Sequence, residues 1–483
     1  MNKHKKIFWV IIILCILIRL INIQMPLLEG AATRQAANAM VATSFYEERY
    51  NIFFPRIHVN GLTPYYYALE IHFIPFIVAS FYKICGDIYP VFFRLISILF
   101  TALSMGMLYR LVAAFLNRSS ALLAILFFGL SPISIYLGRS AHYEMANIFF
   151  NIATLYFFYH WTITEKFKFS LFANFCFLFS VLLKIPNLYL LLPISFLLYS
   201  KWGVRGFAKN WLMYVVFGVI LGAQGWQGHL RSAGTHPDWQ VFSLAYNFER
   251  IVLMLSSHWF YEKIYQDALH YALTPLGFIF FLFGFFLKKR TVLENLFYYW
   301  FLAVSIFVLL MPEAFGVHSY YHIHYLPIAA FFVAKGAFYF KEKGDIYFLK
   351  SKTVGIIFVL IFVLLSARYT IPFYWVPESK KYVLETAKQI KKYVPKEALV
   401  ISSVDSPMTL LFYAHRKGWP MDFSEEVDRS VTILEDLMGK KAEYFVSADK
   451  KALQSENPTF VHYVQAHYKT IFENDFCWIV DLK

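Results

Sequence analysis

The chain has 483 residues, of which 59% are hydrophobic, 20% aromatic and only 16% charged. A soluble domain is about 45–50% apolar and about a quarter charged, so one soluble core cannot hold this much apolar surface. The formal net charge of +14 at pH 7 fits lysines and arginines retained in the cytoplasmic loops of a membrane protein, and we expect no nucleic-acid partner. The cysteines show neither paired nor metal-ligand spacing; they are Cys15, Cys85, Cys176 and Cys477.

The first apolar run, Ile7–Ile23, follows a basic start with Lys3, Lys5 and Lys6. No small-residue cleavage site follows it, which favours an uncleaved span with a cytoplasmic N-terminus. With the later apolar runs, we expect a polytopic α-helical membrane protein with about 11 transmembrane helices. The later runs lie near Val91–Leu111, Ala121–Leu137, Met145–Trp161, Ser170–Leu183, Leu188–Tyr199, Trp211–Trp226, Tyr271–Leu287, Leu296–Met311, Tyr321–Phe338 and Val354–Ala367.

The segment Tyr65–Ile84 is also apolar enough to span, and the basic clusters decide its place. If it lies in the outer interface as a helix, clusters such as Lys288–Arg290 and Lys341–Lys352 face the cytoplasm, as the positive-inside rule requires. If it spans, these clusters face outward. We therefore expect an interfacial helix within a large first outer loop, residues 24–90.

Residues 373–483 differ from residues 1–372, the predicted transmembrane domain, because charges become frequent and apolar runs shorten. Alternating helix and strand patterns predict a small soluble α/β domain outside the cytoplasm, which shapes access for an acceptor or docks a partner. We expect helices over Lys380–Tyr393, Pro407–His415 and Val431–Met438, and strands over Ala398–Ser402, Ala442–Ser447 and Cys477–Leu482.

Ionisable residues gather at the predicted outer ends of the spans. Glu29 precedes Ala31–Ala42, which we expect to form a short amphipathic helix, and an acid at a helix start is also favoured by the dipole alone, by about 0.3–1 kcal/mol. Arg139, His142 and Glu144 follow the third span. Charges at membrane depth are costly and are usually paired or functional, so a self-contained Arg139–Glu144 pair is the alternative to a catalytic site.

Three further features are weaker indications of a functional site. Lys184 lies on the outer side, where snorkelling to the headgroups is the alternative to a binding role. His318, His322 and Tyr325 share one face of a regular helix, which indicates a metal or phosphate-binding surface beside ordinary interfacial tyrosine chemistry. The stretch His229–Ala268 is expected to be an outer loop, with a turn at Gly234–Asp238.

Short motifs follow one another in a fixed order between Ile7 and Phe338. The motifs are Leu28-Glu29-Gly30, Thr63-Pro64-Tyr65, Arg94-Leu95, Ser131-Pro132, Gly138-Arg139-Ser140 with Glu144, Lys184 with Pro186, and His324-Tyr325-Leu326-Pro327. This order resembles the GT-C integral-membrane glycosyltransferases of glycosyltransferase family 39, which include the protein O-mannosyltransferases and the aminoarabinose lipid A transferase.

The resemblance implies an inverting glycosyltransferase that moves a sugar from a polyprenyl-phosphate donor to a hydroxyl of a glycan, lipid or protein. It implies Glu29 as catalytic base and Glu144 as second acid. The resemblance specifies no cofactor, and a divalent cation held by these two carboxylates stays open. The donor phosphate is assigned to Arg139, Lys184, Tyr325 and Arg231, and further pocket candidates are Arg34, His58, His142, His229 and His322.

The expected place is a bacterial inner membrane, with the site at its outer face. The main alternative is a transporter or flippase for a lipid-linked glycan, although no internal repeat of the kind that transporters carry is evident. A third alternative is an assembly factor that works through its C-terminal domain.

Overall fold

The computed structural model describes residues 3–234, 244–343, 352–403, 407–421 and 427–483. The predicted turn at Gly234–Asp238 and the basic cluster Lys341–Lys352 lie largely outside these residues. The chain divides into two compact units. The helical unit comprises Met1–Ile23, Val91–Trp226 and Gln240–Tyr374, and the mixed unit comprises Gln24–Pro90, Gln227–Trp239 and Trp375–Lys483.

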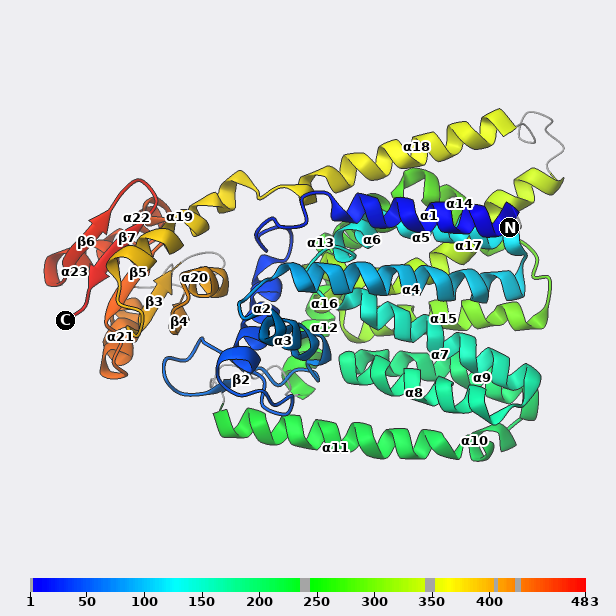
Figure 1. Ribbon diagram of the computed structural model, residues 1–483, viewed down its shortest axis with the longest axis horizontal. Helices are drawn as coiled ribbons and strands as arrows, with labels where there is room; N and C mark the ends of the chain where they lie inside the picture. The colour runs from blue at the N-terminus through cyan, green and yellow to red at the C-terminus, as the bar shows by residue number, and fades with distance from the viewer. Residues whose placement is uncertain (1–2, 235–243, 344–351, 404–406, 422–426) are drawn as a thin grey trace. The chain divides into compact units, whose positions relative to one another are not determined.

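Every apolar run that the sequence predicts as a span contains a helix, and the long helices of the helical unit run side by side (Figure 1). These are α1 (Lys3–Leu20), α4 (Val91–Phe115), α5 (Arg118–Leu130), α7 (Glu144–Thr164), α8 (Phe167–Leu183), α9 (Leu191–Trp202), α11 (Trp211–Gly234), α14 (Thr274–Phe286), α15 (Asn295–Leu310), α17 (Leu326–Lys343) and α18 (Lys352–Thr370). The short helix α6 (Pro132–Leu137) follows α5.

Short elements join these helices. They are η1 (Ile185–Leu190), α10 (Arg205–Lys209), α12 (Leu244–Ser256), α13 (His258–Asp267), the π-helix η2 (Ala268–Ala272), η3 (Val292–Glu294), α16 (Pro312–Val317), the 3₁₀-helix η4 (Ser319–Tyr325) and η6 (Ile371–Tyr374). The predicted outer loop His229–Ala268 is therefore wrong, because the last turns of α11 and the helices α12 and α13 occupy most of it.

Within the described residues, three helical runs are long and apolar enough to cross a membrane: Val91–Phe115, Val292–Leu310 and Gly355–Tyr393. A fourth is added if His258–Ala272 and Thr274–Phe286, which are bent by 100°, count as one span. The prediction of a helical integral membrane protein is confirmed, whereas the number of about eleven spans is not.

The first loop belongs to the mixed unit and contains α2 (Ala32–Glu47), a hairpin of β1 (Arg56–Ile57) with β2 (Tyr65–Tyr66), and α3 (Phe73–Cys85). The prediction of an amphipathic helix here is wrong, because α2 is buried along most of its length and packs against α3, β1 and α20 (Pro407–Ala414). The expected interfacial helix also starts later than Tyr65, since that residue pairs in the hairpin.

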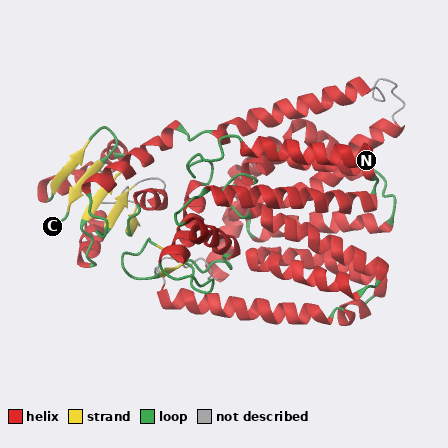
Figure 2. Ribbon diagram, viewed as in Figure 1, coloured by secondary structure: helices red, strands yellow, loops and turns green. Residues whose placement is uncertain are grey.

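The C-terminal part of the mixed unit is a five-stranded sheet of order β4-β3-β5-β7-β6 (Figure 2). Strands β4, β3 and β5 are parallel, and β7 and β6 add antiparallel. A core centred on Trp478, Phe445 and Phe460 packs under one face. The strands are β3 (Val400–Ser403), β4 (Gly418–Met421), β5 (Tyr444–Ser447), β6 (Lys469–Glu473) and β7 (Trp478–Asp481), and the helices are α19 (Glu378–Tyr393), α20, α21 (Val427–Gly439), α22 (Lys450–Glu456) and α23 (Pro458–His467).

The expected helices and strands of this part are confirmed as α19, α20, α21, β3, β5 and β7. Strand β4 was not predicted, because Gly418 and Pro420 are typical of a helix stop. Gly418 is needed for another reason: a Cβ there would lie 1.7 Å from the Val400 carbonyl oxygen of the neighbouring strand. The residue therefore marks a close strand approach.

Candidate functional site

The centre of the candidate site in the helical unit is a buried ion pair. Glu144 begins α7 and Lys184 follows the last residue of α8, so two helix ends bring the side chains together. The Lys184 Nζ lies 2.5 Å from Glu144 Oε1, and the side chains are 7% and 6% exposed. The ammonium also lies 4.0 Å from the ring centroid of Tyr321. Lys184, and not Arg139, is thus the partner of Glu144, and Lys184 points into the unit instead of snorkelling.

A row of polar side chains continues from Glu144 along α7. Asn147 and Asn151 follow it at i+3 and i+7, which places all three on one face of the helix. Asn151 Nδ2 donates to Asn187 Oδ1 at 3.3 Å and to the Tyr189 hydroxyl at 3.0 Å, and Asn187 donates to Asn147. Sequence reasoning missed these asparagines, although their spacing in an apolar helix was a usable signal.

The network ends at His324, whose Nδ1 lies 3.1 Å from the Tyr189 hydroxyl. Within this network of described residues, Glu144 Oε2, Asn147 Nδ2 and His324 Nε2 are buried without a hydrogen-bond partner. Buried polar atoms nearly always have a partner in a folded protein. These three atoms are therefore the ones available to a polar ligand or to water.

Arg139 has a structural position in the same unit. Its guanidinium donates to the carbonyls of Phe373 and Ile21, both at 2.6 Å, and lies 4.2 Å from the Tyr374 ring centroid. The turn that follows is held by Ser97, whose hydroxyl donates to the His142 carbonyl at 3.0 Å. Arg139 and Ser97 thus fix the backbone that leads into Glu144, and the role of Arg139 at a donor phosphate stays a prediction.

The predicted common face of His318, His322 and Tyr325 is wrong. The segment is a 3₁₀-helix with about three residues per turn, so the i, i+4, i+7 spacing does not align these side chains. His322 Nε2 lies 3.7 Å from Asp267 Oδ2, whereas the Tyr325 hydroxyl lies 3.1 Å from Ser305 Oγ. The two residues therefore contact different helices.

Glu29 lies in the mixed unit and is 1% exposed. Its carbonyl accepts a hydrogen bond of 2.8 Å from Gln35 Nε2 on α2. Gly30 has φ +54°, a left-handed conformation that favours glycine, and so turns the chain directly before the helix. Arg34 is engaged nearby by the Glu70 carboxylate and by the Tyr67 hydroxyl, the latter at 2.5 Å.

His58 belongs to a charged cluster in the same unit. Its Nε2 lies 3.2 Å from Glu48 Oε1, which also accepts from Lys417 Nζ at 2.5 Å. Arg56 Nη1 lies 3.7 Å from the other oxygen of Glu48. The hydrogen bond from His58, followed by that from Lys417, lowers the pKa of Glu48 to about 2. Lys417 therefore joins the first loop to the C-terminal sheet through Glu48.

His229 and Arg231 lie on the last turns of α11 instead of in a loop. Their roles in a pocket and at the donor phosphate stay predictions.

The sequence model of the dolichyl-phosphate-mannose-protein mannosyltransferase family matches residues 72–226, which include Arg139, His142, Glu144 and Lys184. No curated protein sequence matches the chain. Solved structures do match the chain. The Archaeoglobus fulgidus oligosaccharyltransferase tethered to an acceptor peptide gives a TM-score of 0.59 at 12% identity, over 98% of this chain and 73% of that one.

ArnT from Cupriavidus metallidurans bound to undecaprenyl phosphate also gives a TM-score of 0.59 at 12% identity, over 98% of this chain and 97% of that one. The mycobacterial arabinofuranosyltransferase AftD gives 0.58 at 12% identity, over 98% of this chain and 41% of that one. The chain has the GT-C fold and is similar to glycosyltransferase family 39. The resemblance drawn from the motif order is thereby confirmed.

The described part of this GT-C chain contains no group of three or more His, Cys, Asp or Glu side chains placed to hold a metal ion. Glu29 and Glu144, the two carboxylates predicted to share a cation, belong to different units. Whether a divalent cation takes part therefore stays a prediction.

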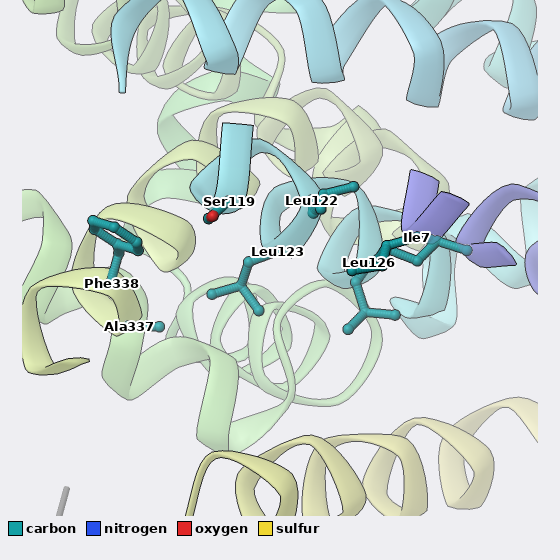
Figure 3. A pocket seen from close by; sticks show the side chains of 8 residues that line it. Ile7, Ser119, Leu122, Leu123, Leu126, Ala337 and Phe338 are labelled. Atoms are coloured by element: carbon teal, nitrogen blue, oxygen red, sulfur yellow. The ribbon is translucent and has the colours of Figure 1, made fainter. Parts of the chain in front are cut away.

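A groove of about 280 Å³ lies between α1, α5 and α17 of the GT-C chain (Figure 3). No ionisable side chain lines it, so it cannot supply acid–base chemistry. It is lined by Ile7, Ile11, Ser119, Leu122, Leu123, Leu126, Ala337 and Phe338.

Proposed function

We propose that the chain is an inverting glycosyltransferase that moves a sugar from a polyprenyl-phosphate donor to a hydroxyl of a glycan, lipid or protein acceptor. The buried Glu144–Lys184 pair is the observation that carries this proposal, because it lies within the segment matched by the mannosyltransferase model. Two structures of similar fold hold undecaprenyl phosphate and dolichol phosphate, which supports a lipid-phosphate donor.

The reaction needs few functional groups from the protein. The acceptor oxygen attacks the anomeric carbon, the bond from that carbon to the phosphate oxygen breaks, and the prenyl phosphate leaves as an anion. Glu29 takes the proton of the attacking hydroxyl. Lys184 stabilises the negative charge of the departing phosphate, and Glu144 fixes the position of the ammonium. No general acid is required, because the phosphate is a stable anion.

Further donor contacts are proposed for Arg231 and Tyr325, and pocket roles for His142 and His229. The enzyme is placed in a bacterial inner membrane with its N-terminus in the cytoplasm and residues 373–483 outside. A transporter for a lipid-linked glycan is the second candidate, since the 100° break between His258–Ala272 and Thr274–Phe286 resembles the broken helices of transporters.

The test uses purified protein and a panel of polyprenyl-phosphate sugars, with released polyprenyl phosphate as the readout. Glu29→Gln and Lys184→Met are each expected to lower release at least about 100-fold. Glu313→Gln is the matched control, because Glu313 forms an exposed pair with Arg250. Active Glu29→Gln protein would reject Glu29 as base. Movement of donor across vesicles without sugar transfer would favour the transporter.

A further inference from the structure

The segment that carries Glu29 is bound by side chains from two helices of the C-terminal domain. The backbone N–H of Leu27 donates to the Tyr413 hydroxyl on α20 at 2.5 Å. Lys380 Nζ on α19 donates to the Gly30 carbonyl at 3.4 Å. The backbone on both sides of Glu29 is therefore held by side chains that are more than 300 positions away in the sequence.

This contact is part of a wider docking within the mixed unit. The first loop also adds to the edge of β4, since the Gly61 N–H donates to the Gly418 carbonyl at 3.1 Å. The Trp419 indole covers Gly61 so closely that a Cβ on Gly61 would lie 2.3 Å from the ring. The Gly61–Gly418 hydrogen bond and the contact with the Trp419 ring hold the first loop against the sheet. The Tyr413 hydroxyl then binds one peptide N–H, that of Leu27, in this docked loop.

We propose that Tyr413 is a positioning residue for Glu29, and that the C-terminal domain sets the place of the base. The inference rests on the proposed function. The Tyr413 hydroxyl fixes the Leu27 peptide, Gln35 fixes the Glu29 carbonyl, and Gly30 turns the chain into α2. A displacement of a reacting group by about 1 Å costs on the order of 100-fold in rate, so the tether affects turnover more than donor binding.

The test is Tyr413→Phe in the full-length protein. Phenylalanine keeps the ring and removes the oxygen that accepts from Leu27. We expect kcat to fall about 10- to 100-fold with the donor KM changed less than about twofold. Backbone amide exchange of residues 25–30 is expected to become faster. Lys380→Met is expected to give a smaller loss, and Lys380→Arg to retain activity. Tyr463→Phe is the control, because the Tyr463 hydroxyl donates to exposed Glu435 in the same unit.

Wild-type kcat in Tyr413→Phe, or unchanged exchange at residues 25–30, would overturn the positioning role. Failure of the proposed function has a different signature. In that case Glu29→Gln protein keeps its activity, or the wild-type protein consumes no donor, while exchange in Tyr413→Phe still rises. That result would leave the tether as a structural contact and would likewise overturn its role in catalysis.

Discussion

Neutralising the Glu144–Lys184 pair one side at a time, and then on both sides, separates its structural contribution from its chemical one. The side chains are 7% and 6% exposed and their charged atoms lie 2.5 Å apart. Removing one partner of a buried pair leaves an uncompensated charge, which costs about 3–5 kcal/mol. Lys184→Met and Glu144→Gln are each expected to lower the free energy of unfolding by that amount.

The double variant Lys184→Met/Glu144→Gln leaves no charge at these two positions. Replacing a buried pair by well-packed hydrophobic residues of similar volume is often close to neutral for stability. Methionine and glutamine likewise leave no unpaired charge, so most of the stability that the single variants lose is expected to return. Some loss remains, because methionine forms no cation–π contact with Tyr321, a contribution of about 0.5–2 kcal/mol. Sugar transfer is not expected to return, since the group proposed to meet the phosphate is gone.

The assay is denaturant-induced unfolding of the four proteins in detergent micelles, followed by tryptophan fluorescence, beside release of polyprenyl phosphate. Glu313→Gln is again the control, and its effect is expected to stay below about 1 kcal/mol because the pair is exposed. A double variant whose free energy of unfolding is no higher than that of the less stable single variant would refute the coupling between Glu144 and Lys184. A double variant with wild-type transfer would refute the chemical role of Lys184.

Two predictions concern the mixed unit. Because the pKa of Glu48 is lowered to about 2 from 4.5, the folded state binds fewer protons than the unfolded state, so the stabilisation is full above pH 4.5 and is lost as the pH falls towards 2. Because Glu48 is partly exposed, its contribution to the free energy of unfolding is limited to about 1–2 kcal/mol. Glu48→Gln should remove this dependence on acid when unfolding is measured at a series of pH values. Gly30→Ala should cost about 1–2 kcal/mol, since φ is +54°. Gly439→Ala is its control, with open space around the new methyl group, and equal unfolding curves would contradict the strain at Gly30.

Much of the helical unit could be predicted from local pattern. A run such as Val91–Leu111 has to satisfy its backbone internally when it is surrounded by lipid, which leaves a helix as the available structure. The same holds for the strands β3, β5 and β7, whose apolar runs are bounded by turn residues. The number of spans was less predictable, because Pro132 divides one predicted span into α5 and α6.

The sequence around a residue does not indicate which distant side chain that residue contacts in the folded protein. The alternative partner that the sequence offers for Glu144 is Arg139, five positions away, whereas the observed partner Lys184 is 40 positions away and follows another helix. Similarly, the arginine and the glutamine of the alanine-rich α2 predict an amphipathic helix if both side chains face water. Gln35 is instead buried and bound to the Glu29 carbonyl. A polar side chain in a helix indicates a polar neighbour, and that neighbour need not be solvent.

The first loop illustrates why helices and strands can be predicted from local pattern, whereas the segments that pack into one compact unit cannot. Its α2 buries nearly all of its residues, and part of that cover comes from α20. Deleting residues 375–483 would therefore expose apolar surface on α2 and remove the acceptor of the Leu27 N–H. Loop and sheet form one compact unit although α4 to α18 lie between them in the sequence. The C-terminal part of the chain consequently helps to hold the segment around Glu29 in its folded conformation.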